Sequence, residues 1–158
     1  MTTLFTMGQN GKATTEKKTF SRQTKVSIDI QADPEIIWNL LTNASDIPRW
    51  NSTIVSLEGD IRLGEKIRLV STLDEKRTFK LKIKAFEPEQ KLAWGDGMGT
   101  RYFILTPNAD GSVNFTMDEK IGGPMFPLFA KMIPPFDESF EQFAADLKKE
   151  AEVIANTK

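Results

Sequence analysis

The chain has no cysteine and no histidine among its 158 residues. Their absence excludes cysteine nucleophiles, Ser-His-Asp triads, zinc sites with nitrogen or sulfur ligands, and an imidazole that exchanges protons near neutral pH. Any catalysis would have to use carboxylates, Lys, Arg, Tyr or water. We therefore expect neither a metal site nor a cofactor.

The chain also lacks an excess of charge of either sign, and it lacks a long apolar run. Its 21 basic and 22 acidic residues give a net charge of -1. This balance argues against a nucleic-acid partner, because such binding relies on Lys and Arg to neutralise phosphates. No apolar run approaches the roughly 20 residues that cross a bilayer, so we expect no stable membrane insertion. The first residues, MTTLFTMGQNGK, lack the basic and apolar regions of a secretory signal, and we expect a cytoplasmic protein.

What is present is typical of one globular domain. With 39% hydrophobic and 27% charged residues, a chain of this length can bury roughly two thirds of its unfolded surface without disulfide or metal crosslinks. Residues 1–23 are rich in Thr, Lys, Gln and Gly, and we interpret them as a flexible N-terminal tail that could pair with an edge strand. Residues 24–158 then form the folded domain.

The order of elements within this domain predicts its fold. Residues 25–31 alternate apolar and polar side chains as a half-buried strand does, and residues 34–43 and 45–50 have the spacing of two short helices. Six strands follow between residues 53 and 121, and their short turns make neighbouring strands antiparallel. Residues 135–155 repeat apolar side chains at helical spacing. We predict an α+β fold in which a curved antiparallel seven-stranded sheet, with two short helices after its first strand, wraps around a long C-terminal helix.

Five short motifs carry a resemblance to a known superfamily. They are Ala32-Asp33-Pro34-Glu35-Ile36-Ile37-Trp38, Asp46-Ile47-Pro48-Arg49-Trp50-Asn51, Leu92-Ala93-Trp94-Gly95, Arg101-Tyr102-Phe103-Ile104-Leu105-Thr106-Pro107 and Gly122-Gly123-Pro124. Over residues 24–155 the chain resembles the helix-grip fold of the START/Bet v 1-like superfamily, in its polyketide cyclase/dehydrase-like (SRPBCC) branch. The resemblance implies a cavity between the sheet and the long helix that takes apolar or aromatic ligands. Similar domains bind lipids, act as cyclases or serve as protein partners.

The turn at Gly97-Met98 decides which side chains would face this cavity. If the turn has two residues, Trp94 lies opposite Arg101, and both share the inner face of the sheet with Phe103. If the turn has three residues, Tyr102 points inward in place of Arg101 and Phe103.

The turn at residues 88–89 sets the register of the preceding strand pair. Two residues in this turn would place Ala85 opposite Leu92, and Ile83 opposite Trp94. Ile83 and Trp94 would then share the inner face. This register would extend the apolar surface beneath the helix.

The strand at residues 65–73 has two possible orientations. It could present Ile67 and Leu69 to the inner face, or Arg68 and Val70. The sequence alone leaves both orientations open, because the preceding turn has no clear length.

The side chains that face the cavity form the predicted ligand site. They come from the inner face of the sheet, the first helices and the C-terminal region. The predicted ligand-binding residues are Trp50, Leu69, Phe79, Leu81, Ile83, Trp94, Arg101, Phe103, Phe115, Met117, Glu119, Phe129, Met132, Ile133, Phe136 and Phe140. An ordinary packed core would have the same aromatic concentration. A ligand cavity of the usual kind would measure roughly 300 to 1,000 Å³.

Arg101 and Glu119 are the polar residues that fall in phase with apolar positions on neighbouring strands. They could be a polar handle in an apolar pocket. They could instead be a structural ion pair near a sheet end, or exposed side chains displaced by a bulge. Asp96 is a further candidate, although Asp is common in turns for purely local reasons.

These residues lead us to expect a protein that binds or transports a hydrophobic or aromatic small molecule, lipid-like or polyketide-like, with one polar group. One alternative is a cyclase/dehydratase-like enzyme in which Glu119 is the base and Arg101 stabilises an oxyanion. A carboxylate paired with Arg should be a weak base, which ranks the enzyme second. The other alternative is a protein-interaction module with a large exposed apolar patch. The sequence assigns neither the ligand nor an oligomeric state.

Overall fold

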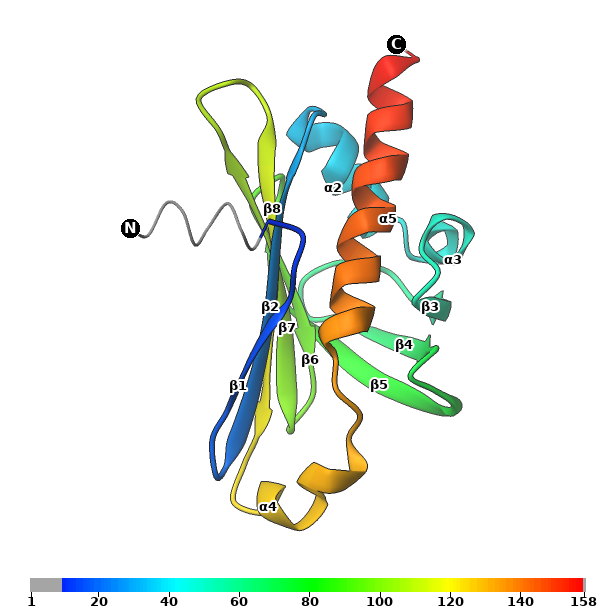
Figure 1. Ribbon diagram of the computed structural model, residues 1–158. Coiled ribbons are helices and arrows are strands. Elements are labelled where there is room, and N and C mark those ends of the chain that lie inside the picture. Colours follow the sequence, from blue (N-terminus) through cyan, green and yellow to red (C-terminus); the bar gives the residue numbers. More distant parts are fainter. Residues whose placement is uncertain (1–9, 158) are drawn as a thin grey trace, which may run out of the picture.

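The computed structural model describes residues 10–157, which form one open, curved antiparallel sheet packed on a C-terminal helix (Figure 1). The eight strands follow the order β1-β2-β8-β7-β6-β5-β4-β3 across the sheet. The strands are β1 (Thr14–Lys17), β2 (Ser21–Ile30), β3 (Ile54–Glu58), β4 (Lys66–Ser71), β5 (Asp74–Glu87), β6 (Lys91–Gly95), β7 (Gly99–Pro107) and β8 (Val113–Gly122). The helices are α2 (Pro34–Thr42), η1 (Ala44–Asp46), α3 (Ile47–Trp50), α4 (Phe126–Phe129), η2 (Ala130–Met132) and α5 (Asp137–Asn156).

The predicted α+β helix-grip architecture is confirmed, with eight strands instead of seven. The additional strand is β1, in the segment that the sequence suggested was a tail. The residues of β1, TTEK, carry no apolar alternation, so the pattern gave no strand signal. β1 pairs antiparallel with β2. It also contacts the start of α5, because the Thr15 hydroxyl donates to Asp137 Oδ1 at 2.6 Å, and just before β1 the Ala13 N–H donates to Glu141 Oε2 at 2.8 Å.

The proposed boundary between residues 23 and 24 falls inside β2. Val26, Ile28 and Ile30 alternate as predicted, and the same alternation continues back through Thr24 to Arg22. Whether the preceding segment is required for folding stays a prediction that deletion variants can test. Within residues 10–157, no helix is long and apolar enough to cross a membrane.

The sheet bends so that its two wings enclose α5. In Figure 1, β1, β2, β7 and β8 form one wing, β3, β4 and β5 form the other, and α5 runs along the angle between them. The buried positions of α5 lie along one face of the helix and are all at most 1% exposed. They are Phe140, Phe143, Ala144, Leu147 and Ala151.

The aromatic core fills the space between α5 and the sheet. The Phe143 ring lies 5.8 Å from the Phe103 ring and 6.3 Å from the Phe115 ring, measured between centroids. The Trp50 ring contacts the Phe143 ring at 6.1 Å from the other side. Such distances are typical of packed aromatic pairs, so this part of the interior is filled by side chains.

The register of β6 and β7 is the predicted one. Trp94 pairs with Arg101, and the Asp96 N–H donates to the Gly99 carbonyl at 2.9 Å, which leaves a two-residue turn. Phe103 is fully buried and Tyr102 points outward, so the alternative with a three-residue turn is wrong.

The register of β5 and β6 differs from the prediction in one respect. Ala85 pairs with Ala93, not with Leu92, because the turn after Glu87 has three residues. Its central residue, Glu89, has a left-handed backbone with φ 62°. A bulge at Lys84 absorbs the extra residue and restores the expected pairing of Ile83 with Trp94, which shows how one irregularity compensates another.

The strand with two possible orientations is resolved as β4. Ile67 and Leu69 are buried on the inner face, whereas Arg68 points to solvent. Leu69 pairs with Phe79 of β5. β4 and β5 therefore present an apolar inner surface next to Trp94.

Candidate functional site

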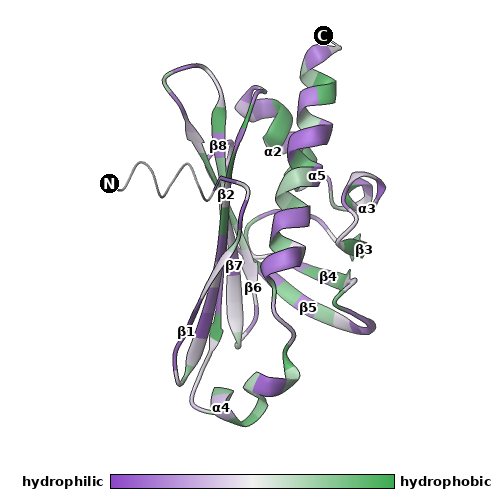
Figure 2. Cartoon of the chain, viewed as in Figure 1, coloured by the Kyte–Doolittle hydropathy of each residue, from purple (hydrophilic) through white to green (hydrophobic). Residues whose placement is uncertain are grey.

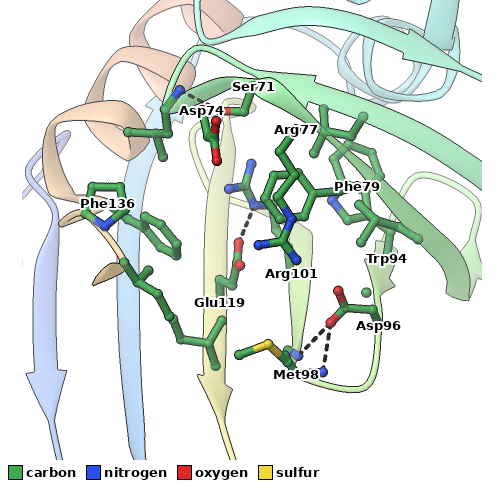
Figure 3. Close-up of a pocket in the computed structure, with 18 of the residues that line it drawn as sticks. Ser71, Asp74, Arg77, Phe79, Trp94, Asp96, Met98, Arg101, Glu119 and Phe136 are labelled. Carbon is green, nitrogen blue, oxygen red and sulfur yellow. Dashed lines mark hydrogen bonds and ion pairs between the residues drawn. The ribbon is translucent and has the colours of Figure 1, made fainter. Parts of the chain in front are cut away.

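A pocket of about 200 Å³ lies at the end of the sheet beyond the first turn of α5. One wall consists of strands β4 to β8, and the other is the coil between η2 and α5 (Figure 3). The volume is below the roughly 300 to 1,000 Å³ expected of a ligand cavity. The pocket also lies beside the coil, whereas the prediction placed it under the long helix, because the phenylalanines of α5 fill that space.

Part of the predicted ligand site surrounds this pocket. The strands contribute apolar walls and one ion pair, and the coil before α5 contributes the opposite wall. The predicted residues that line the pocket are Leu69, Phe79, Leu81, Trp94, Arg101, Glu119, Met132, Ile133 and Phe136.

The other predicted site residues lie away from the pocket. Phe129 is half-buried in α4 and does not line it. The rest are members of the packed core, where other side chains already occupy the space around them. They are Trp50, Ile83, Phe103, Phe115, Met117 and Phe140. Which of the predicted residues contact a ligand stays a prediction.

Arg101 and Glu119 form an ion pair inside the pocket. They are directly opposite on β7 and β8, and Arg101 Nε donates to Glu119 Oε1 at 2.7 Å. Their side chains are 12% and 17% exposed, so they are not displaced into solvent by a bulge. The Arg101 guanidinium also lies 4.9 Å from the centroid of the Phe140 ring. Figure 3 shows the pair between Phe79 and Trp94 on one side and Phe136 on the other.

The remaining donors of Arg101 are available to a ligand. Nε is bound to Glu119 and one face of the guanidinium is covered by Phe140. Within the described part of the chain, no acceptor is hydrogen-bonded to the two terminal nitrogens of Arg101. Two N–H-bearing nitrogens in an apolar pocket can bind a carboxylate, a phenolate or a carbonyl oxygen of a ligand.

Arg22 holds the coil wall of the pocket in place. Its terminal nitrogens donate to the Ile133 carbonyl at 3.1 Å and to the Pro134 carbonyl at 2.8 Å. Its guanidinium lies 4.8 Å from the centroid of the Phe136 ring. Burial lowers the pKa of Arg22, although the charges of nearby carboxylates act in the opposite direction. Its Nε is buried and has no hydrogen-bond partner among residues 10–157.

Sequence reasoning missed Arg22, although a signal was present. Arg22 continues the two-residue alternation of Thr24, Val26 and Ile28, so it had to share their face once the strand extended that far. The prediction began the strand at residue 25 and therefore did not consider Arg22.

Asp96 has a local role in its turn. Its Oδ1 accepts hydrogen bonds from the N–H groups of Met98 at 2.8 Å and Gly99 at 3.1 Å, as Figure 3 shows. Gly99 is required at this place, because a Cβ there would lie 2.6 Å from Ile121 Cγ2. Pocket-lining residues outside the predicted site come mainly from turns and strand ends. They are Ser71, Leu73, Asp74, Arg77, Gly95, Asp96, Met98, Gly99, Ile121 and Pro134.

The polar groups of the pocket do not converge as metal ligands do. Among residues 10–157, no group of three or more acidic side chains is placed to hold a metal ion. The pocket instead combines aromatic and aliphatic walls with the Arg101–Glu119 pair, and Asp74, Arg77 and Asp96 also line it. This combination suits an organic ligand with a polar end.

The sequence matches a family model described as polyketide cyclase / dehydrase and lipid transport, over residues 21–152. The chain belongs to this family. The match begins with β2 and ends within α5, so it includes every strand of the sheet except β1. A comparison with curated proteins finds no match.

Solved structures share the fold of the family. A START superfamily protein from Mycobacterium smegmatis is 17% identical, with a TM-score of 0.62, covering 84% of this chain and 98% of that chain. A conserved protein of unknown function from Enterococcus faecalis is 16% identical, with a TM-score of 0.65, covering 93% of this chain and 81% of that chain. A norcoclaurine synthase mutant from Thalictrum flavum, in complex with a transition-state analogue, is 15% identical, with a TM-score of 0.65, covering 88% of this chain and 99% of that chain. These likenesses confirm the START/Bet v 1-like fold.

Proposed function

We propose that the protein binds a small apolar or aromatic molecule, with one polar or anionic group, in the pocket around Arg101. The supporting observation is the state of Arg101, whose terminal nitrogens lack a protein partner within residues 10–157 while Trp94 and Phe79 line the same pocket. An apolar wall with a few placed donors is the common composition of small-molecule sites. The description of the family, which includes lipid transport, agrees with this proposal.

The size of the pocket limits the ligand. At about 200 Å³ it holds a small aromatic molecule or one end of a longer chain. A larger ligand would require the coil of residues 133–135 to move away from the sheet. Arg22 holds this coil through two carbonyl groups, so such a movement would break both hydrogen bonds.

The geometry of Glu119 favours ligand binding over catalysis as the function of the pocket. Its Oε1 already accepts the Arg101 Nε–H at 2.7 Å, and that hydrogen bond would have to break before this oxygen could take a proton from a substrate. The pair is better suited to fixing the polar end of a ligand, with the carboxylate orienting the guanidinium. A cyclase/dehydratase-like activity remains the second candidate, carried by the same two residues.

An anilinonaphthalene sulfonate titration tests the proposal, because this fluorophore combines an aromatic body with an anionic group. We expect saturable binding of one molecule per chain. In the double variant Arg101→Leu/Glu119→Leu, which removes both members of the ion pair, affinity should fall at least about tenfold, since a hydrogen bond to a charged group contributes about 1.5–3 kcal/mol.

The matched control is Arg68→Leu on the outer face of β4, which should bind the fluorophore like the unmodified protein. Circular dichroism verifies that each variant is folded. Unchanged affinity in the folded double variant would show that the pocket is not the binding site. Native mass spectrometry of protein purified from its own host would then identify any small molecule that it retains.

A further inference from the structure

Exposed apolar side chains gather at the pocket end of the molecule. Nine large apolar residues are exposed among residues 10–157, and five of them lie at this end. The Phe20 carbonyl accepts the Gly123 N–H and the Met98 carbonyl accepts the Gly122 N–H, so both turns adjoin the segment that leads into α4. We call these five residues the lower apolar face: Phe20, Met98, Met125, Leu128 and Met132. The other four, Val55, Leu63, Tyr102 and Val153, lie on separate elements.

Such a cluster of exposed apolar side chains indicates a site of contact with another molecule. Single exposed apolar residues are normal on protein surfaces, but contiguous patches mark sites of contact with proteins, membranes or ligands. Leu128 is 71% exposed and Met132 is 76% exposed, which are the two largest values among the large apolar residues described. The sheet and α5 leave these side chains uncovered.

The charges around the lower apolar face are mainly cationic, and the acidic groups beside it include Asp96, which accepts the Met98 N–H, and Glu16. From Lys120 to Phe136 the sequence contains two lysines and no acidic residue. Lys120 and Lys131 are both exposed. Lys18, beside Phe20, is 65% exposed and has one acidic neighbour, Glu16, at 3.3 Å. Figure 2 shows α4 and the following turn mostly in hydrophobic colours with a hydrophilic band.

Apolar side chains with interspersed lysines match the surface of an anionic lipid bilayer. The apolar groups can enter the boundary between headgroups and acyl chains, and the lysines remain at the phosphates. Each lysine near such a surface contributes about 1 kcal/mol. A protein interface, in contrast, is typically depleted of lysine in its centre.

The lower apolar face continues into the pocket. Met98 and Met132 belong to both, since each is exposed and each lines the pocket. An apolar ligand could therefore pass between the pocket and a surface that covers this face without crossing water. Within the described residues, the hydrogen bonds that tie residues 124–135 to distant parts of the chain are those from Arg22, and the Phe126 N–H donates locally to the Gly123 carbonyl.

We propose that the lower apolar face docks reversibly on the surface of an anionic lipid bilayer, and that the pocket exchanges its ligand there. The exchange rests on the proposed binding function, whereas the docking does not. The contact is peripheral, because five side chains at the end of a sheet enter only the headgroup boundary. Through this contact, the bilayer would supply the ligand to the pocket or receive it from the pocket.

Flotation of the full chain with lipid vesicles tests the docking. The vesicles contain phosphatidylcholine alone, or phosphatidylcholine with about one third phosphatidylglycerol, which supplies the negative surface potential. We expect binding to the anionic vesicles. The double variant Met125→Ser/Leu128→Ser should reduce the bound-to-free ratio at least about tenfold, because it removes apolar groups that enter the boundary.

Two matched variants make the result specific. Leu63→Ser/Val153→Ser changes two residues of similar exposure, 65% and 53%, at other places and should leave vesicle binding unchanged. Lys120→Gln/Lys131→Gln should weaken binding to anionic vesicles by at least about fivefold at low salt, with a smaller effect at high salt. Equal losses in the Leu63/Val153 variant would overturn the proposal.

Two further outcomes would also overturn it. The first is an absence of binding to anionic vesicles. The second is a dimer, seen by sedimentation equilibrium, that the Met125/Leu128 variant converts to monomers, because a second copy would then cover the face. Fluorophore binding without vesicles is measured in parallel. Its retention in a protein that fails to bind vesicles leaves the proposed function standing, and its loss in a protein that binds vesicles contradicts the proposed function alone.

Discussion

The two ends of the space beneath the sheet differ in what covers them. Towards the C-terminus of α5, the helix places Phe143, Leu147 and Ala151 against the sheet, and no solvent reaches them. At the other end, the cover is the coil around Pro134-Pro135, and a pocket remains. The same strands, β7 and β8, pass through both ends.

The covering element contributes to the difference between core and pocket. A helix can present a bulky residue every three or four positions, and its ridges fill the inner surface of a sheet. Two consecutive prolines cannot continue a helix and have no N–H to donate, so the coil approaches the sheet only where Arg22 reaches its carbonyls. The strands differ as well, since β7 and β8 present Phe103 and Phe115 at the packed end but the Arg101–Glu119 pair at the pocket end.

Removing a ring from the packed end should have the largest effect on stability. Phe143→Ala should lower the free energy of unfolding by about 3–5 kcal/mol, because it leaves a cavity among Trp50, Phe103 and Phe115. Urea denaturation measures the change. Phe79→Ala, at a half-buried position that already borders the pocket, should cost only about 1–2 kcal/mol. Equal costs would mean that the two ends are packed alike.

Separating the ion pair in the pocket should have the next largest effect. Arg101→Leu or Glu119→Leu alone should cost about 3 kcal/mol, because either change leaves a largely buried charge without its partner. The double variant should recover most of this loss. A double-mutant cycle from urea unfolding gives the coupling free energy. Single effects that are small and additive would show that the two side chains do not interact in solution.

Releasing the coil from β2 should have a smaller and more local effect. Arg22→Met removes two hydrogen bonds to carbonyls and should cost about 2 kcal/mol. Hydrogen exchange should accelerate in residues 124–135 and stay unchanged at the centre of α5. Arg22→Lys keeps the charge but not the forked geometry of the guanidinium. Its hydrogen-exchange rates in residues 124–135 should lie between those of the unmodified protein and those of Arg22→Met. Uniform acceleration along the chain would refute a local role.

The smallest effect concerns the far end of α5. Burial raises the pKa of Glu152, but hydrogen bonds from the Gln31 N–H and from Lys148 outweigh it and leave the pKa below its ordinary value of 4.5. At pH values above 4.5 the carboxylate therefore stabilises the fold. This contribution is lost as the pH falls through the lower pKa of the folded state.

Glu152→Gln tests this dependence on pH. At neutral pH it should lower the free energy of unfolding by less than about 1 kcal/mol, because Glu152 is partly exposed. Urea unfolding at successively lower pH should show the difference shrinking below pH 4.5. If the two proteins still differ in the free energy of unfolding at acid pH, the glutamine destabilises the fold for steric reasons and not through the loss of charge.

The architecture could be predicted because its signals are local. Alternation marked the strands, helical spacing marked α5, and the Gly97-Met98 turn set the pairing of Trp94 with Arg101. The β5–β6 turn could not be placed, since Glu89 adopts a left-handed backbone that its residue type does not favour. The sequence left open that the N-terminal segment pairs with an edge strand, but β1 itself could not be placed, because its residues lack apolar alternation and its region is held by Asp137 and Glu141, over a hundred positions away.

The site could be predicted only in part, for a related reason. Alternation identifies the inner face of a strand, but Phe103 and Arg101 share that face and have different surroundings. Which of them borders a pocket depends on where α5 begins. Its first residue is Asp137, and the coil before it follows a path that depends on Arg22.

The pairing of β2 with β8 also affects how the chain folds. β2 can pair with β1 early, but it gains its second neighbour, β8, only when Gly122 pairs with Ser21, and Arg22 donates to the Ile133 carbonyl 111 residues later in the chain. Closing so long a loop is slow. Until it closes, one edge of β2 is unpaired and its apolar face is uncovered, which favours aggregation. During synthesis this edge is exposed until β8 has left the ribosome. The coil wall of the pocket follows β8 in the chain, so the pocket cannot form before β8 has been made.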